Sequence, residues 1–203
     1  MKAKKKKREA LGRPRLFDTE KALDSATRVF REKGYEGASL NDLTKAMGIN
    51  RPSMYAAFGD KEALFRKVLD RYACTTKSFF EQALSAKTAR EVAQRLLHGA
   101  VEMQTCENSP RGCLITQGAL VSGKEGEPIR RELTKKRHEQ EEVIRERLVR
   151  ARKEGDLPKS ANPADLARYL TTVMQGMSVL ANGGASRSEL QKVAETALQA
   201  WPT

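Results

Sequence analysis

The spacing of apolar residues constrains the fold of this chain more than any other feature. In successive segments these residues recur every three or four positions, as at Ala22, Ala26, Val29 and Phe30, and the alternation typical of strands is nearly absent. Such spacing gathers apolar side chains on one face of a helix. The sequence therefore predicts an all-α protein with about nine helices and no sheet.

Residues that begin and end helices set the expected boundaries. The candidate N-caps are Asp18, Ser39 and Asp60, and the candidate stops are Gly34 and Gly48. Between them the sequence predicts a first helix over 18–34, a short second helix over 39–48, a third over 51–58 and a long fourth helix from 60. Later helices are expected over about 88–104, 113–121, 128–155, 163–183 and 186–201.

Positive charge is concentrated at the N-terminus. The net charge is +12, and residues 1–15 contain eight Lys or Arg residues and one Glu. A block of like charge does not pack, so we expect 1–15 to be disordered when free. A basic balance favours polyanions, with nucleic acid before membrane. The arm therefore either contacts nucleic acid or serves only as a solubilising tail.

The segment SLNDLTKAMGINRPSMYAAFGDK, residues 39–61, predicts a helix-turn-helix. Two short helices flank a glycine-containing turn, and apolar anchors fix their angle. These anchors are Leu43, Met47, Ile49, Met54 and Phe58. The second helix of such a motif lies in the major groove of DNA, with its N-terminal residues at the base edges.

This segment resembles the signature of the TetR family of transcriptional regulators. The matching residues are Gly48, Ile49, Asn50, Tyr55, Phe58 and Lys61, preceded by the linker Gly34–Ser39. The strong match covers about residues 15–65. Two departures are Thr44, where the family usually has a small Ala, and the pair Ala56 and Ala57, where larger or polar groups are common.

The resemblance implies a role for each matching residue. Ser39, Tyr55 and Lys61 would hold phosphates, although Tyr55 could instead be a core residue. Arg51 would donate bidentately to guanine, and Pro52 and Ala56 would make apolar contacts with bases. Gly12-Arg13-Pro14-Arg15 resembles an AT-hook core that enters the minor groove, although it could be an ordinary linker. The full predicted DNA-binding set is Arg13, Arg15, Ser39, Asn50, Arg51, Pro52, Ser53, Tyr55, Ala56 and Lys61.

The resemblance also implies three parts: a basic arm (1–15), a DNA-binding domain (16–62) and a regulatory and dimerisation domain (63–203). The last two helices would pair with a second copy, because one recognition helix reads few base pairs. The residues predicted for dimerisation are Leu166, Leu170, Val173, Met177, Leu190, Val193, Ala197 and Trp201. The same stripes could instead build only the core of the subunit.

The resemblance also implies a ligand pocket among the helices between about Leu64 and Leu148. Its candidate lining residues are Leu96, Met103, Leu114, Gln117, Val143 and Met174, although most of these could be plain core residues. Cys106 and Cys113 are candidate redox or electrophile sensors, because a thiolate near cationic Arg111 would be reactive. The alternative is that both cysteines are unreactive packing residues.

The sequence favours a cytoplasmic regulator, most simply a repressor that a small-molecule or redox signal releases from operator DNA. No run approaches the roughly 20 apolar residues of a membrane helix, and the N-terminus lacks the apolar stretch of a secretory signal. We expect no enzymatic activity, cofactor or metal site, since no phosphate-binding loop, nucleophile elbow or metal-ligand spacing is present. A non-specific architectural DNA-binding protein is the main alternative, and activation instead of repression stays open.

Overall fold

The computed structural model describes residues 17–106, 111–118 and 126–202. Within these ranges the chain forms helices and no strands, which confirms the predicted all-α class. The helices are α1 (Thr19–Gly37), α2 (Leu40–Met47), α3 (Arg51–Phe58), α4 (Lys61–Leu84), α5 (Ala89–Thr105), α6 (Leu114–Gln117), α7 (Glu127–Lys153), α8 (Pro163–Asn182) and α9 (Arg187–Gln199). None of the helices in the described part is long and apolar enough to cross a membrane. The arm at 1–15 lies outside the described residues.

Side-chain caps fix where the N-terminal helices begin. The carboxylate of Asp18 accepts hydrogen bonds from the backbone at the start of α1, and Ser39, Asn50 and Asp60 cap α2, α3 and α4 in the same way. These caps satisfy amide groups that a helix leaves without partners at its first turn. Helix α1 is interrupted at Gly34, whose φ of 70° and ψ of 177° are not helical. The first helix therefore breaks at the predicted glycine, and a further turn follows it.

The helices gather around two apolar cores. The first core joins α1–α4 to α6 and the beginning of α7, and its largest fully buried side chains include Phe30, Phe58 and Phe65. The aromatic ring of Phe30 meets that of Phe65 edge-on, with a centroid distance of 4.9 Å. This core extends past position 63, because the first turns of α4 pack into it together with α6 and α7.

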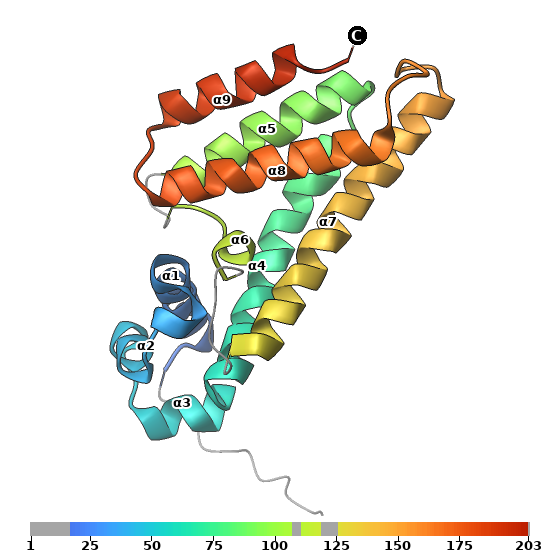
Figure 1. Cartoon of the computed structure of the whole chain (residues 1–203). Helices are drawn as coiled ribbons and strands as arrows, with labels where there is room; N and C mark the ends of the chain where they lie inside the picture. Colours follow the sequence, from blue (N-terminus) through green and yellow to red (C-terminus); the bar gives the residue numbers. More distant parts are fainter. Residues whose placement is uncertain (1–16, 107–110, 119–125, 203) are drawn as a thin grey trace, which may run out of the picture.

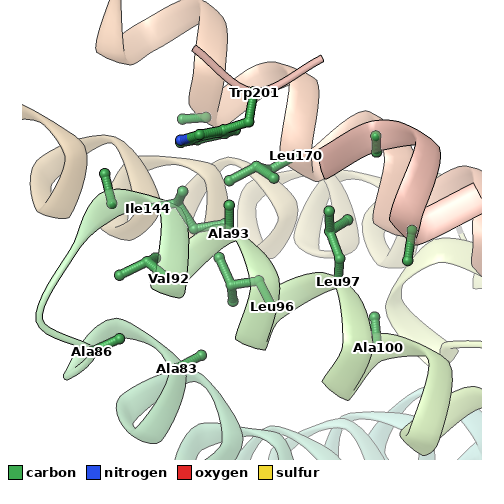
Figure 2. Packing of buried hydrophobic residues seen from close by; sticks show 14 of the residues in the cluster. Ala83, Ala86, Val92, Ala93, Leu96, Leu97, Ala100, Ile144, Leu170 and Trp201 are labelled. Carbon is green, nitrogen blue, oxygen red and sulfur yellow. The ribbon is translucent and has the colours of Figure 1, made fainter. Parts of the chain in front are cut away.

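The second core lies among the last turns of α4 and helices α5, α7, α8 and α9. Figure 2 shows Val92, Leu96 and Leu97 of α5 packed beneath Leu170 and Trp201. Helices α1–α3 lie at one end of α4 and α7, while α5, α8 and α9 stack at the other end (Figure 1). Helix α4 therefore runs from the end of α3 into the second half of the molecule. At about 1.5 Å per residue, this helix is about 36 Å long.

Candidate DNA interface and ligand cavity

Helix α3 is anchored on one face and open on the other. Met54 is fully buried and Phe58 is 2% exposed, so both side chains fasten the helix to the first core. Arg51 and Ala56 are exposed on the opposite face, and the Tyr55 side chain is 47% exposed. The helix therefore presents its N-terminal polar and small residues outward without losing its packing.

Local capping holds the start of α3 and α2 in place. The Asn50 side-chain oxygen accepts from the Ser53 amide at 2.8 Å, which makes Asn50 a cap as well as a member of the predicted set. Ser39 accepts from the Asp42 amide at 3.1 Å and donates its hydroxyl proton to the Asp42 carboxylate at 2.7 Å. Hydrogen bonds first from Lys33 and then from Ser39 lower the pKa of Asp42 to about 2.

Lys61 stands at the first turn of α4, close to the recognition helix. Its Nζ lies 4.7 Å from the centroid of the Tyr35 ring and donates to the Glu36 carbonyl at 3.4 Å. The ammonium group is therefore held against the link between α1 and α2. All predicted DNA-binding residues in the described part lie at this end of the molecule, on α3 or at the starts of α2 and α4. Arg13 and Arg15 lie outside the described residues.

A cavity of about 70 Å³ lies between the two ends of the molecule, among α4–α8. Its lining residues are Tyr72, Thr76, Phe79, Phe80, Ala100, Met103, Gln104, Cys113, Thr116, Gln140, Thr171, Met174 and Gln175. Of the predicted ligand-contacting residues, Met103 and Met174 lie on this cavity, and so does the predicted sensor Cys113. The walls are apolar and neutral polar, with no charged side chain among the lining residues.

The other predicted ligand residues lie elsewhere. Leu96 is fully buried in the second core, and Leu114 is buried in the first. Gln117 is half-buried and is not among the lining residues of this cavity. Val143 is 46% exposed and lines a more open groove of about 430 Å³ between α4 and α7. Sequence reasoning missed Gln104, although a neutral polar residue among the apolar positions of α5 is a signal that could have found it.

Cys113 lies against groups that bear on its chemistry. Burial raises the pKa of Tyr72, and the nearby Cys113 thiol acts in the same direction. Burial lowers the pKa of Arg137, whereas the nearby Cys113 acts in the opposite direction. The cation expected near the thiol was Arg111, whose guanidinium instead donates to the Gly184 and Ala185 carbonyls.

The remaining cysteines differ from Cys113 in their surroundings. Cys106 is exposed at the end of α5, and the residues that follow it, 107–110, lie outside the described part. Cys74 is also exposed and lies on the open groove between α4 and α7. Only Cys113, among the three, lines the cavity.

The segment that carries Cys113 also touches the DNA-binding end directly. The Arg31 guanidinium of α1 donates to the Gly112 carbonyl at 2.7 Å in a buried setting and lies 5.8 Å from the centroid of the Tyr72 ring. On the other side, the Cys113 amide donates to the Ser178 hydroxyl of α8 at 2.7 Å. Residues 112–113 therefore bridge α1 and α8, and Cys113 itself lines the cavity.

Most residues predicted for dimerisation pack within the subunit. Leu170, Met177 and Leu190 are fully buried. Ala197 and Trp201 are 5% and 3% exposed, while Leu166 and Val173 are partly buried against the second core. Val193 alone among the eight is exposed, at 36%. The apolar residues that face outward on α8 are Val179 and Leu180, which are 48% and 50% exposed.

Two family descriptions match the chain over the two regions described above. Residues 22–68 match "Bacterial regulatory proteins, tetR family", and residues 93–197 match "Tetracyclin repressor-like, C-terminal domain". The first covers most of α1, all of α2 and α3, and the beginning of α4. The second covers most of α5–α9.

Whole-chain comparisons point the same way. The chain is 32% identical over 197 residues to the Escherichia coli HTH-type transcriptional repressor ComR, covering 96% of this chain and 94% of ComR. It is 30% identical to the Escherichia coli repressor BdcR over 98% of this chain and 96% of BdcR. A solved cysteine mutant of the TetR family regulator CifR, in complex with 26-base-pair operator DNA, is 43% identical with a TM-score of 0.89, covering 94% of this chain and 100% of that one. The chain therefore belongs to the tetR family of bacterial regulatory proteins.

Proposed function

We propose that this protein is a cytoplasmic, non-enzymatic repressor that binds operator DNA as a homodimer and is released by a small-molecule or thiol-modifying signal. The observation that carries the proposal is the exposed N-terminal face of α3, held from behind by Met54 and Phe58. Support for repression comes from ComR and BdcR, which are both named transcriptional repressors. Support for operator binding comes from CifR, whose structure contains operator DNA.

Base reading is assigned to the outward residues of α3. Arg51 is exposed at the first turn, where its guanidinium reaches guanine O6 and N7 in the major groove. Pro52 and Ala56 supply apolar contacts, which suit thymine methyl groups. Ser39, Tyr55 and Lys61 hold phosphates on either side, and Arg13 and Arg15 of the arm enter the minor groove.

Dimerisation is assigned to the outward faces of α8 and α9. Val179, Leu180 and Val193 leave large apolar side chains in water in the single chain, and burial against the same face of a second copy would stabilise the pair. A twofold interface uses the same patch on both subunits. Two copies of α3 would then meet two half-sites of one operator.

Signalling is assigned to the cavity and to its links with the DNA-binding end. Helix α4 begins beside α3 and contributes Tyr72, Thr76 and Phe79 to the cavity wall. The Arg31–Gly112 hydrogen bond gives a second link, from α1 to the segment beside Cys113. A ligand that fits the cavity better in the DNA-free arrangement shifts the population away from operator binding.

Cys113 is the proposed site of the thiol-modifying signal, with Cys106 as the second candidate. An alkylating agent attached at Cys113 would occupy the cavity and press on Tyr72 of α4. Treatment with iodoacetamide should release operator DNA from the wild type and from Cys106→Ser, and should leave Cys113→Ser bound. Release from the double variant Cys106→Ser/Cys113→Ser would rule out both thiols as the signal site.

Competition binding tests the proposed function itself. A sequence selected from a random DNA pool should stay bound when random DNA is added in large excess. The reason is that specific binding is typically about 10³–10⁷-fold tighter than non-specific binding. An architectural DNA-binding protein would lose the labelled sequence as random DNA is added. A reporter gene placed behind the selected sequence separates the two directions of control. Expression should fall when the protein is present, and a rise would identify an activator.

A further inference from the structure

Gln104 of α5 lines the cavity and has a buried hydrogen-bond acceptor without a donor among the described residues. The residue is only 7% exposed and belongs to the cavity wall. Its Nε2 donates to the Met174 carbonyl at 3.3 Å, which orients the amide group. Its Oε1 is buried and accepts no hydrogen bond from any residue in the described part of the chain. A buried acceptor without a donor is costly, so this position calls for a partner that the described part of the chain does not supply.

The remaining walls define what kind of partner fits. Phe79, Phe80, Met103 and Met174 give the cavity an aromatic and thioether surface, and no Asp, Glu, Lys or Arg lines it. A charged ligand would find no counterion there and would lose its hydration. The volume of about 70 Å³ is well below that of the roughly 150 Å³ cavity that holds benzene. The site therefore suits a molecule with few non-hydrogen atoms.

We propose that the cavity binds a small uncharged organic molecule through a hydroxyl or N–H group that donates a hydrogen bond to Gln104 Oε1. The apolar part of the molecule lies against Phe79, Phe80 and the two methionines. This inference rests on the proposed function, which makes the cavity the place where the signal acts. Gln104 is then the residue that sets specificity, because a site built around a hydrogen bond rejects an analogue that lacks the donor.

Two probes of nearly the same shape test the inference. 2-Propanol and acetone have the same four non-hydrogen atoms, but only the alcohol donates a hydrogen bond. Each is titrated into the full-length protein while the methyl NMR signals of Met103 and Met174 are recorded. Both methyl signals should shift, and 2-propanol should bind about tenfold more tightly than acetone, as expected for a donor that satisfies a buried acceptor. Equal affinities, or no shift of either methyl signal, would overturn the inference.

Matched variants assign the preference to one side chain. Gln104→Leu removes the acceptor and should abolish the preference for 2-propanol. Gln140→Leu makes the same change elsewhere on the cavity wall and should retain the preference. A preference that survives in Gln104→Leu overturns the inference, and the wild-type comparison of the probes stands even if that variant does not fold. Operator binding is measured on the same samples. If the wild type distinguishes the two probes but binds no specific DNA, the proposed function alone is contradicted. If the wild type binds its operator but does not distinguish the two probes, this inference alone is contradicted.

Discussion

Replacing Arg31 with leucine should lower the free energy of unfolding more than the same replacement of any arginine on the surface. Arg31 is 8% exposed, and its Nη2 donates to the Gly112 carbonyl at 2.7 Å. A buried hydrogen bond from a charged group contributes about 1.5–3 kcal/mol, and its loss leaves the Gly112 carbonyl without this donor. Arg31→Leu should therefore lower the free energy of unfolding by about 2–3 kcal/mol. In a chain of this size each kcal/mol lowers Tm by about 2–4 °C, so Tm should fall by about 4–12 °C.

Arg71→Leu is the matched control for this prediction. Arg71 also ties α4 to α1, through Asp24 and Glu20, but its side chain is 37% exposed. Exposed ion pairs contribute at most about 1 kcal/mol, so the control should lose far less stability. Urea unfolding followed by circular dichroism measures both variants against the wild type. Equal losses for Arg31→Leu and Arg71→Leu would refute the reasoning that burial of the Arg31–Gly112 bond determines its contribution.

Four further predictions concern individual residues and the arm. Gly112→Ala should lower the free energy of unfolding by at least about 1–2 kcal/mol in urea titrations, because its φ of 82° is strained for alanine; an unchanged midpoint would contradict the conformation described here. Arg51→Ala should weaken operator binding by about 1–3 kcal/mol and relax the preference at one base pair, whereas an equal loss on all sequences in a binding assay would place Arg51 on a phosphate. Deleting residues 2–15 should reduce the slope of log affinity against log salt, and an unchanged slope would remove the arm from the interface. Asp42→Asn should be destabilising near pH 7 and progressively less so as the pH falls from about 4 through 2, because the folded-state pKa of Asp42, about 2, lies below the ordinary value of 3.8. The difference in urea midpoint between wild type and variant measures this effect. A difference that stays constant over this pH range would contradict the assigned hydrogen bonds.

The sequence predicted features that depend on nearby residues. The caps at Asp18, Ser39 and Asp60 act within three residues of themselves, so their residue types and positions sufficed. The burial of Met54 and Phe58 followed equally well from their spacing within one short helix. The recognition helix was thus predictable with its buried and open faces, and family membership followed from the same local pattern.

The cavity was harder to predict from the sequence, because its walls come from five helices. Leu96 and Met103 both lie on α5, yet Leu96 packs into the second core and Met103 lines the cavity. The periodicity of α5 shows that both positions face inward, but only the packing of α4, α7 and α8 around it decides which one meets the cavity. Gln104 became notable only when its Oε1 was found without a donor among the described residues.

The faces of α8 posed a different problem, because this helix has apolar residues on more than one side. Leu170 and Met177 were predicted to meet a second subunit, but both are fully buried within their own. The large apolar side chains that α8 exposes are instead those of Val179 and Leu180, on its outward side. An apolar stripe alone does not indicate whether the same subunit or a partner covers it. That distinction depends on where α5 and α9 pack. The spacing of apolar residues within one helix does not determine those positions.

Photo-crosslinking from α3 to operator DNA is the most direct test of the central claim. That claim is that the two copies of α3 in a dimer read bases in two half-sites of one operator. A photoreactive residue at position 56, on the exposed face of α3, should crosslink to bases in both halves of an inverted repeat. The two crosslinks should lie about 34–36 Å apart along the duplex, or a multiple of that distance. The same group at Ser85, exposed at the opposite end of α4 from α3, should give none. Crosslinks at a single location, or an equal yield from both positions, would contradict the account.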